Sequence, residues 1–298
     1  MPELPDLTVY VEALQRRVCG TRLLAVEVRH PFLLRTYEPP IGALIGRHVT
    51  QVQRRAKRIV LGFEGDLWLA LHLMIAGRLH WASREATRGR AGVRSGLARF
   101  EFDSGTLTLT EAGSKRRAAL ALFAGETQLQ QALPRGLEVL EADAASFAAQ
   151  LARENHTLKR ALTDPRLFAG IGNAYSDEIL HRARLSPLAL TRRLGSEQVQ
   201  RLYAAIHAVL GEWTERLRAQ SGAEFPRRVT AFRAGMGVHG RFGEPCPVCG
   251  TRVQRIRYAE NETNYCPRCQ TQGRVLADRA LSRLLKADWP RTIEELEQ

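Results

Sequence analysis

The sequence predicts an α+β protein with two domains: an N-terminal β-sandwich or flattened barrel with flanking helices, and a C-terminal helical domain followed by a β-hairpin. Three observations lead to this prediction. The first 130 or so residues contain short runs rich in Val, Ile and Leu, separated by glycine or charged turns. From about residue 144 the apolar residues recur at helical spacing instead. Two Cys-x-x-Cys pairs then lie on either side of a short segment near the C-terminus.

The N-terminal part begins with a predicted helix, because Leu7, Val11, Leu14 and Val18 recur at helical spacing. Strand-like runs follow it. The segment 98–113 predicts a β-hairpin, since apolar residues alternate with polar ones on both sides of an Asp-Ser-Gly turn. These elements predict a mainly β domain with the opening helix packed against it.

The C-terminal part is predicted to be helical up to the cysteines. Its helical segments share alanine and leucine at helical spacing, with polar residues between them: 143–153, 156–164, 172–185 and 196–220. The predicted parts of the chain are the β domain at 1–130, a linker at 131–143, a helical domain at 144–225, the cysteine hairpin at 226–272 and a helical tail at 273–298. Leu276, Ala280 and Leu284 share one face of this tail, which predicts that the tail packs on the protein.

The charge of the chain indicates a polyanionic partner. Lys and Arg number 44 against 31 acidic residues, which gives a net charge of +13 at pH 7. Each phosphate that such a surface neutralises releases condensed counterions, so the basic excess favours a nucleic acid. No run of about 18 apolar residues is present and the N-terminus lacks the layout of a secretory signal. We therefore expect a cytoplasmic protein with no membrane partner.

Four of the five cysteines form two close pairs, Cys246 with Cys249 and Cys266 with Cys269. A Cys-x-x-Cys turn directs two sulfurs to one point, and the segment between the pairs is long enough to fold back as a hairpin. Zn²⁺ favours four thiolates in a tetrahedron, so the spacing predicts one Zn²⁺ held by these four cysteines. The predicted role of this zinc is structural, because four thiolates leave no open position for a reacting water.

The first residues have two interpretations. In one, Pro2 and Pro5 only stiffen the start of the helix. In the other, removal of Met1 gives Pro2 a free secondary amine. Such an α-amine titrates near ~8 whereas a lysine amine titrates near ~10.4, so far more of it is nucleophilic at neutral pH. Glu3 then lies in place to supply the proton that attack on a sugar carbon requires.

The segment Gly-Ile-Gly-Asn at 170–173 opens a predicted helix. Its glycines allow close approach of the backbone to a partner, and the exposed N–H groups at a helix start bind anions. Asn173 is then expected beside a phosphate. The alternative is that these residues only mark a helix boundary.

Four segments together resemble the formamidopyrimidine-DNA glycosylase and endonuclease VIII family. They are "PELPD" at the start, "QRRAK" before a strand, "GIGNAYSDEIL", and "GEPCPVCG" with "YCPRCQ" near the end. They occur in order from Pro2 to about Gln270. The resemblance implies a helix–two-turn–helix in the helical domain and a zinc finger of bacterial type. It also implies a monomer in the bacterial cytosol or nucleoid whose partner is damaged DNA.

The implied activity is that of a base-excision-repair DNA glycosylase with AP lyase activity. Such an enzyme flips a damaged, oxidised base out of the duplex, and the N-terminal proline attacks C1′ of the deoxyribose. A Schiff base forms, and β- and δ-elimination cut the strand. By resemblance, Pro2 is the nucleophile, Glu3 is the acid that protonates the sugar, and Lys57 binds phosphate beside the lesion. Residues implied near the DNA backbone are Lys159, Gly172 and Asn173.

The chain departs from the family pattern in the zinc hairpin. Asn261 aligns with an arginine that grips phosphates around the flipped nucleotide, and asparagine cannot supply that charge or a bidentate fork. Arg257 or Arg274 is then expected to take over this grip. The segment before the cysteines is also shorter than in the 8-oxoguanine-specialised branch, so 8-oxoguanine is not assigned as the preferred base.

The residues that fill the gap left by a flipped base also differ. "HLMIAG" stands where the family has "HLGMSG", so the resemblance places Ile75 at the position whose side chain fills this gap. The alternative is that Ile75 is a core residue of a strand. Arg116 or Arg117 is expected to face the orphan base, but no aromatic residue accompanies them.

Two other classes remain open. One is a non-catalytic zinc-containing protein that binds DNA or recognises damage, which has no need of a nucleophilic terminus. If Met1 is retained, Pro2 has no free amine that could form a covalent bond to the sugar, and only this class is left. The other is an RNA-binding module, which the sequence disfavours because no clustered basic and aromatic motif is present.

Overall fold

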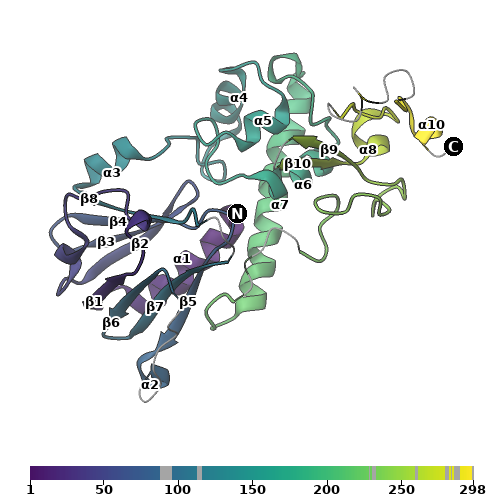
Figure 1. Ribbon diagram of the computed structural model, residues 1–298. Helices are drawn as coiled ribbons and strands as arrows, with labels where there is room; N and C mark the ends of the chain where they lie inside the picture. Colours follow the sequence, from purple (N-terminus) through teal and green to yellow (C-terminus); the bar gives the residue numbers. More distant parts are fainter. Residues whose placement is uncertain are drawn as a thin grey trace. The chain divides into compact units, whose positions relative to one another are not determined.

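The computed structural model describes residues 1–87, 96–112, 116–227, 229, 233–258, 261–278, 282, 284 and 289–296. The chain divides into two compact units, Met1–Arg135 with Trp213–Thr230, and Gly136–Glu212 with Ala231–Gln298 (Figure 1). Within the described ranges, no helix combines the length and the apolar character that crossing a bilayer requires.

The first unit contains the opening helix and two antiparallel four-stranded sheets. Helix α1 spans Leu4–Val18. One sheet has the order β1 (Leu23–Val28), β6 (Ala98–Phe102), β7 (Gly105–Glu111) and β5 (Gly77–Ser83). The other has the order β2 (Val49–Arg55), β3 (Arg58–Phe63), β4 (Leu67–His72) and β8 (Ala119–Ala124). Its short helices are η1 (Pro31–Leu33), η2 (Ile41–Leu44), α2 (Arg84–Thr87) and α3 (Glu126–Ala132).

The core of this unit lies between the two sheets and α1. Leu14 of α1, Leu61 of β3 and Phe100 of β6 belong to one cluster of buried side chains. The opposite face of the second sheet is covered too, because Trp68 of β4 packs with Leu129 of α3. Strands β3 and β4 are therefore buried on both faces, which explains why their sequences are almost continuously apolar.

The second unit is helical and ends in the cysteine hairpin. Its helices are α4 (Ala144–Ala152), α5 (Leu158–Thr163), α6 (Asn173–Ala183), η3 (Thr191–Arg193), α8 (Pro267–Thr271) and α10 (Ile293–Leu296). Helix α7 spans Ser196–Ser221, and its residues up to Glu212 belong to this unit. Strands β9 (Gln254–Tyr258) and β10 (Asn261–Tyr265) pair antiparallel.

The predicted fold class is confirmed by these elements. The opening helix, the hairpin of β6 and β7, and the helices α4 to α7 lie where the periodicity predicted them. Strand β8 and helix α3 were not predicted.

The predicted packing of the tail on the protein is confirmed at Leu276, but the predicted shared face is wrong. Leu276 packs with Ile256 and Tyr265, but Leu284 is 77% exposed, so the two side chains do not share a packed face. The reason is that the tail is extended after Gly273, where the Val275 N–H donates to Arg291 O (2.8 Å). Helical spacing therefore does not relate Leu276 to later residues. Ala280 lies outside the described residues.

Gly77 is required by the turn that joins β4 to β5. Its N–H donates to Leu73 O (2.8 Å), and a Cβ at position 77 would lie 2.2 Å from that same oxygen. We expect Gly77→Ala to lower the free energy of unfolding by about 1–3 kcal/mol, because a backbone contact of this kind cannot relax cheaply. Gly42→Ala is the control, since a Cβ there meets nothing within 4 Å. Urea denaturation of both variants measures the difference, and equal stability would contradict the clash.

Candidate functional site

Three segments of the first unit meet at one end of the sheet that contains β2, β3, β4 and β8. The β2–β3 hairpin closes where Arg55 pairs with Arg58, so the turn holding Lys57 lies at this end. His72, the last residue of β4, pairs with Ala119 at the start of β8. The β4–β5 turn with Ile75 and the segment of Arg116 and Arg117 therefore lie at the same end. We call this set of segments the sheet end.

The N-terminal amine is surrounded by charged side chains. Pro2 is buried, and Glu3, the N-cap of α1, is only 3% exposed. The Glu3 N–H donates to Asp6 Oδ2 (3.0 Å), which caps the helix. In this structure the N-terminal amine belongs to Met1. Burial lowers the pKa of the Met1 amine; Arg78 and Lys57 lower it further, while Glu3 and Asp6 act in the opposite direction. An amine in this place is neutral, and hence nucleophilic, at a lower pH than an exposed one.

The turn after β4 presents Ile75 to solvent. Ile75 is 60% exposed, whereas Met74 is half-buried with a left-handed backbone (φ 51°). Burial, with Arg58 and Lys57, lowers the pKa of His72 to about 4. The neutral His72 ring therefore accepts the Met74 N–H at Nδ1 (3.3 Å), which fixes the shape of the turn.

Arg116 and Arg117 are both exposed at the sheet end. The Arg116 guanidinium donates to the ring of His30, and the Arg117 N–H donates to the Glu111 carboxylate (2.9 Å). Residues 113–115 of the same loop lie outside the described residues. Beside these side chains is a cavity of about 630 Å³, whose lining includes Arg117, Arg58 and Arg35 and, within the described ranges, no carboxylate. The sheet end is thus a positively charged surface, and its Lys57 lowers the pKa of the N-terminal amine.

In the second unit, Lys159 and Asn173 have partners within the protein. Lys159 Nζ forms an ion pair with Asp177 and donates to Asn173 O (2.7 Å). Asn173 Nδ2 donates to Glu262 O of β10 (2.8 Å). Gly172 is the N-cap of α6, so the N–H groups that open this helix lie next to both side chains. The start of α6 and the cysteine hairpin are therefore joined directly.

A buried carboxylate network, missed by the sequence analysis, supports this junction. Asp177 Oδ2 accepts from His239 Nδ1 (2.8 Å) and from the Asn264 N–H (3.1 Å). Glu178 accepts three backbone N–H groups from residues 237–239. The signal in the sequence was an Asp-Glu pair inside an amphipathic helix, but the partners lie some 60 residues further along the chain.

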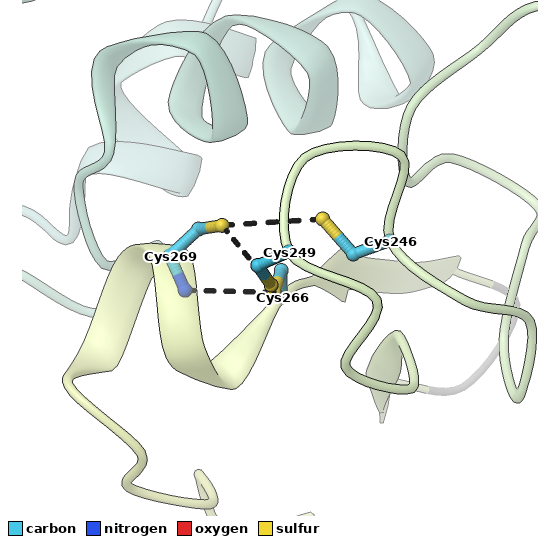
Figure 2. Close-up of side chains that lie close together, drawn as sticks. All are labelled: Cys246, Cys249, Cys266 and Cys269. Carbon is cyan, nitrogen blue, oxygen red and sulfur yellow. Dashed lines mark hydrogen bonds between the residues drawn. The ribbon is translucent and has the colours of Figure 1, made fainter.

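The four predicted metal ligands converge in the structure (Figure 2). Their sulfurs all lie within 4.8 Å of one another. The distance is 3.4 Å from Cys249 to Cys266 and 3.9 Å from Cys246 to Cys269. A tetrahedral zinc with Zn–S bonds of about 2.3 Å places its sulfurs about 3.8 Å apart, so the cluster fits this metal.

One histidine supports the cysteine cluster from α6. Burial lowers the pKa of His181, which keeps its ring neutral, and Nε2 lies 3.3 Å from Cys246 Sγ. A neutral imidazole in this position donates its N–H to the thiolate and orients it. Burial also raises the pKa of the Cys269 thiol to about 12, so the thiolate there needs a cation beside it.

Arg257 and Asn261 lie toward the tip of the hairpin, and both are exposed. The Arg257 N–H donates to Asp278 Oδ2 (2.7 Å), which holds the strand while the guanidinium remains accessible. Arg274 is exposed as well, and its backbone bridges to Thr292 in the tail. The residues between β9 and β10 lie outside the described ranges.

We expect the purified protein to contain about one zinc per chain and Cys266→Ser to lose it, because three remaining thiolates cannot complete the tetrahedron. Cys19→Ser is the control, since Cys19 is exposed and apart from the cluster. Metal content is measured by elemental mass spectrometry, and thermal unfolding should shift only in the Cys266 variant. Full zinc content in Cys266→Ser would contradict the assignment.

Three family models match successive parts of the chain. Residues 1–118 match the formamidopyrimidine-DNA glycosylase N-terminal domain, residues 136–222 the H2TH domain of the same proteins, and residues 243–272 the zinc finger found in FPG and IleRS. The last match coincides with the cysteine cluster, and so supports one structural zinc bound by the four cysteines.

Two related proteins cover most of the chain, and a third covers half of it. A formamidopyrimidine-DNA glycosylase of Thermus thermophilus is 34% identical over 280 residues, which is 92% of this chain and 100% of that protein. The enzyme of Heliobacterium modesticaldum is 33% identical over 91% of this chain and 100% of its own. An uncharacterised formamidopyrimidine-DNA glycosylase-like protein of Mycobacterium tuberculosis is 43% identical over 51% of this chain and 96% of its own.

Solved structures share the fold. The crystal structure of MutM (Fpg) from Thermus thermophilus superposes with a TM-score of 0.74 at 31% identity, over 90% of this chain and 98% of that one. A complex of Lactococcus lactis Fpg with DNA containing an abasic site superposes with a TM-score of 0.77 at 24% identity, over 90% and 99%. The matches over nearly the whole length show that this chain belongs to the formamidopyrimidine-DNA glycosylase family.

Proposed function

We propose that this protein is a base-excision-repair DNA glycosylase with AP lyase activity, whose nucleophile is the amine of Pro2 after removal of Met1. The observation that carries the proposal is the buried setting of Pro2 and Glu3 at the start of α1, where burial, Arg78 and Lys57 lower the pKa of the Met1 amine, one residue before Pro2. A protein that only binds DNA has no need of such an amine. Membership of the family supports the same reaction class.

The proposed chemistry starts at the deoxyribose of a damaged nucleotide. The Pro2 nitrogen forms a bond to C1′ while the bond from C1′ to the base breaks; the base leaves with the electron pair of that bond and takes up the proton that the Pro2 amine loses. Glu3 donates a proton to the ring oxygen as the sugar opens, which gives a Schiff base between Pro2 and C1′. Loss of a proton from C2′ then expels the 3′ phosphate, and a second elimination expels the 5′ phosphate.

The proposed DNA contacts follow the positive surface of each unit. In the first unit, Lys57 binds a phosphate beside the lesion, Ile75 fills the gap left by the flipped base, and Arg116 and Arg117 face the orphan base. The exposure of Ile75 and both arginines supports these assignments.

In the second unit, the helix start at Gly172 and Asn173 binds the backbone, and Lys159 holds that helix start in place. Arg257 replaces the phosphate grip that Asn261 cannot supply, and the exposure of Arg257 supports this assignment. We further propose that the protein acts as a monomer on damaged DNA in the cytosol, with the β domain at 1–130 carrying the catalytic groups and the parts at 144–225 and 226–272 binding DNA.

Borohydride trapping on an oligonucleotide with an abasic site tests the nucleophile. We expect a covalent adduct from the wild type, a strongly reduced adduct from Pro2→Gly, which replaces the secondary amine of proline with a primary one, and a rate lowered about 10²- to 10⁴-fold by Glu3→Gln, the range for a lost general acid. Pro5→Ala is the control: it keeps the adduct if the role of Pro2 is chemical and not one of stiffening the chain. Intact mass of the same sample confirms loss of Met1.

Two outcomes would overturn the proposal. One is a mature protein that retains Met1, and the other is a wild type that forms no adduct. Either would leave the non-catalytic zinc-containing DNA-binding protein as the function of this chain.

The pH dependence of trapping tests the environment of the amine. Burial and nearby cations lower the pKa of the Met1 amine, and we expect them to act in the same direction on a Pro2 amine one residue further along the chain. Its neutral form should then be populated below the usual value of about 8, and adduct formation should reach half its maximal rate below that pH. Arg78→Met removes one cation and should move the midpoint upward. Arg22→Met, which breaks the pair with Asp103 on the β1–β6 edge, is the control and should leave it unchanged. A midpoint above 8, or one insensitive to Arg78, would contradict the assigned environment.

A further inference from the structure

The outer face of the sheet that contains β2, β3, β4 and β8 is hollowed beside the sheet end. Side chains alternate between the two faces of a strand, and Leu120 and Leu122 of β8 belong to the core. Ala119 and Ala121 therefore lie on the outer face, where Ala121 pairs with Ala70 of β4. These three small side chains line the cavity of about 630 Å³ described above. A hollow remains on this face because methyl groups stand where larger side chains would fill it.

This cavity extends from the sheet end to α3. Arg117 lines it at the sheet end, and Phe123 of β8 lines it at the other end, where Phe123 packs with Leu129 of α3. Four residues of β8 separate Ala119 from Phe123, which corresponds to about 13 Å of strand. A chain that enters from the sheet end meets α3 after this length. The cavity therefore suits the end of a DNA strand better than a continuous strand.

The polar groups along this cavity are hydrogen-bond donors. Arg35, Arg58 and Arg117 line it and, within the described ranges, no carboxylate does; we call it the arginine groove. Thr36 also lines it, and its Oγ1 accepts the Leu122 N–H (2.8 Å), so the hydroxyl proton stays available to a ligand. The Arg35 N–H donates to a carbonyl of β8 (2.8 Å). The donors of the segment at 35–36 are therefore anchored to the strand that forms the floor of the groove.

Arg58 carries a charge that the described part of the chain does not neutralise. It is half-buried, and none of the described carboxylates pairs with it. Arg55, on the same hairpin, forms an ion pair with Glu126 (3.1 Å). Burial lowers the pKa of Arg58, and Arg58 in turn lowers the pKa of His72. A half-buried guanidinium without a counter-charge costs free energy, and a bound anion offsets that cost.

We propose that the arginine groove binds the terminal phosphate of a cleaved DNA strand. The inference rests on the proposed function, whose two eliminations leave a 5′ phosphate on one fragment and a 3′ phosphate on the other. A terminal phosphate is a monoester with a charge of about −1.5 to −2 at pH 7, whereas a phosphate within a strand carries a single negative charge. It therefore binds clustered guanidinium groups more strongly than an internal phosphate does. A strand end held in this groove stays on the protein after the reaction.

The experiment uses the full-length, zinc-containing protein and duplexes with a one-nucleotide gap, so that no catalytic step is needed. The gap carries a 5′ phosphate, a 3′ phosphate, or hydroxyl groups on both sides, and fluorescence anisotropy gives the Kd of each duplex. We expect at least one phosphorylated duplex to bind about 10-fold more tightly than the hydroxyl duplex, in the range for charge-assisted hydrogen bonds. Equal Kd values for the three duplexes would overturn the proposal.

Variants locate this preference in the groove. The preference is a ratio of two Kd values, so a general loss of DNA affinity cancels. Arg58→Met should abolish it, and Arg58→Lys should keep part of it, because lysine retains the charge but not the planar fork. Ala121→Leu should abolish it as well, since the larger side chain fills the groove while all three arginines remain.

Arg99→Met is the matched control. Arg99 is also a half-buried strand arginine of the first unit, but it lies in the other sheet and pairs with Glu101 (3.2 Å). It should leave the preference unchanged. A preference that survives both Arg58→Met and Ala121→Leu, or one that Arg99→Met removes equally, would contradict the assigned site.

Deoxyadenosine monophosphate tests the other source of the same chemical group. It should compete weakly with the phosphorylated duplex, because it lacks the flanking DNA that binds at the sheet end. Competition at equal concentration would assign the groove to a free nucleotide and overturn the assignment to a strand end.

Borohydride trapping separates this inference from the proposed function. If the wild type forms the adduct but shows no preference for a phosphorylated gap, only the arginine groove is refuted. If the wild type forms no adduct, the catalytic proposal fails, while the gapped duplexes still decide whether the groove binds a terminal phosphate.

Discussion

The packing of α1 against the β core is the interaction on which the candidate active site depends. Leu7, Tyr10 and Leu14 are fully buried, and burial of each such side chain stabilises the fold by roughly 1.5–3 kcal/mol. Tyr10 also accepts the Leu79 N–H of β5 at its hydroxyl (3.4 Å), so the helix is tied to the strand that carries Arg78. Pro2 and Glu3 directly precede this helix. Their position relative to the sheet end is thus set by apolar packing rather than by the charged groups themselves.

The second unit holds a short hairpin, whose apolar clusters are small, against the start of α6. It does so with a buried carboxylate and a metal-binding cluster. Burying Asp177 costs free energy unless it is paired, and Lys159, His239 and Asn264 supply the donors. Helix α6 connects the buried carboxylate with the cysteine cluster, since it carries Asp177 and since His181 on the same helix faces the cysteines. Lys159 and Asn173, which the sequence assigned to DNA contacts, therefore also belong to the hydrogen-bond network that holds the start of α6.

Local sequence patterns correctly predicted the elements that short-range interactions determine. The helical period of α1, the alternation in the β6–β7 hairpin and the spacing of the cysteines each depend on residues close together in the chain. Strand β8 was missed because its alanine-rich sequence has no clear period, and its pairing with β4 joins segments some 50 residues apart. The pairing of Asp177 with His239 and the approach of Arg78 to the amine were missed for the same reason. The tail differed from its prediction because a backbone pairing with residue 291 keeps the chain out of a helix at Val275.

The hairpin of β2 and β3 has one consequence for how this protein can vary. Its turn consists of Ala56 and Lys57 alone, with Ala56 in the left-handed region (φ 51°) and buried. Side chains alternate between the faces of a strand, so adding or deleting one residue here would turn Ile59 and Leu61 away from the core and bring Val60 into their place. The packing of the core therefore fixes the length of this turn. Lys57 at its tip stays at the same distance from the sheet even where the residues on the surface around it change.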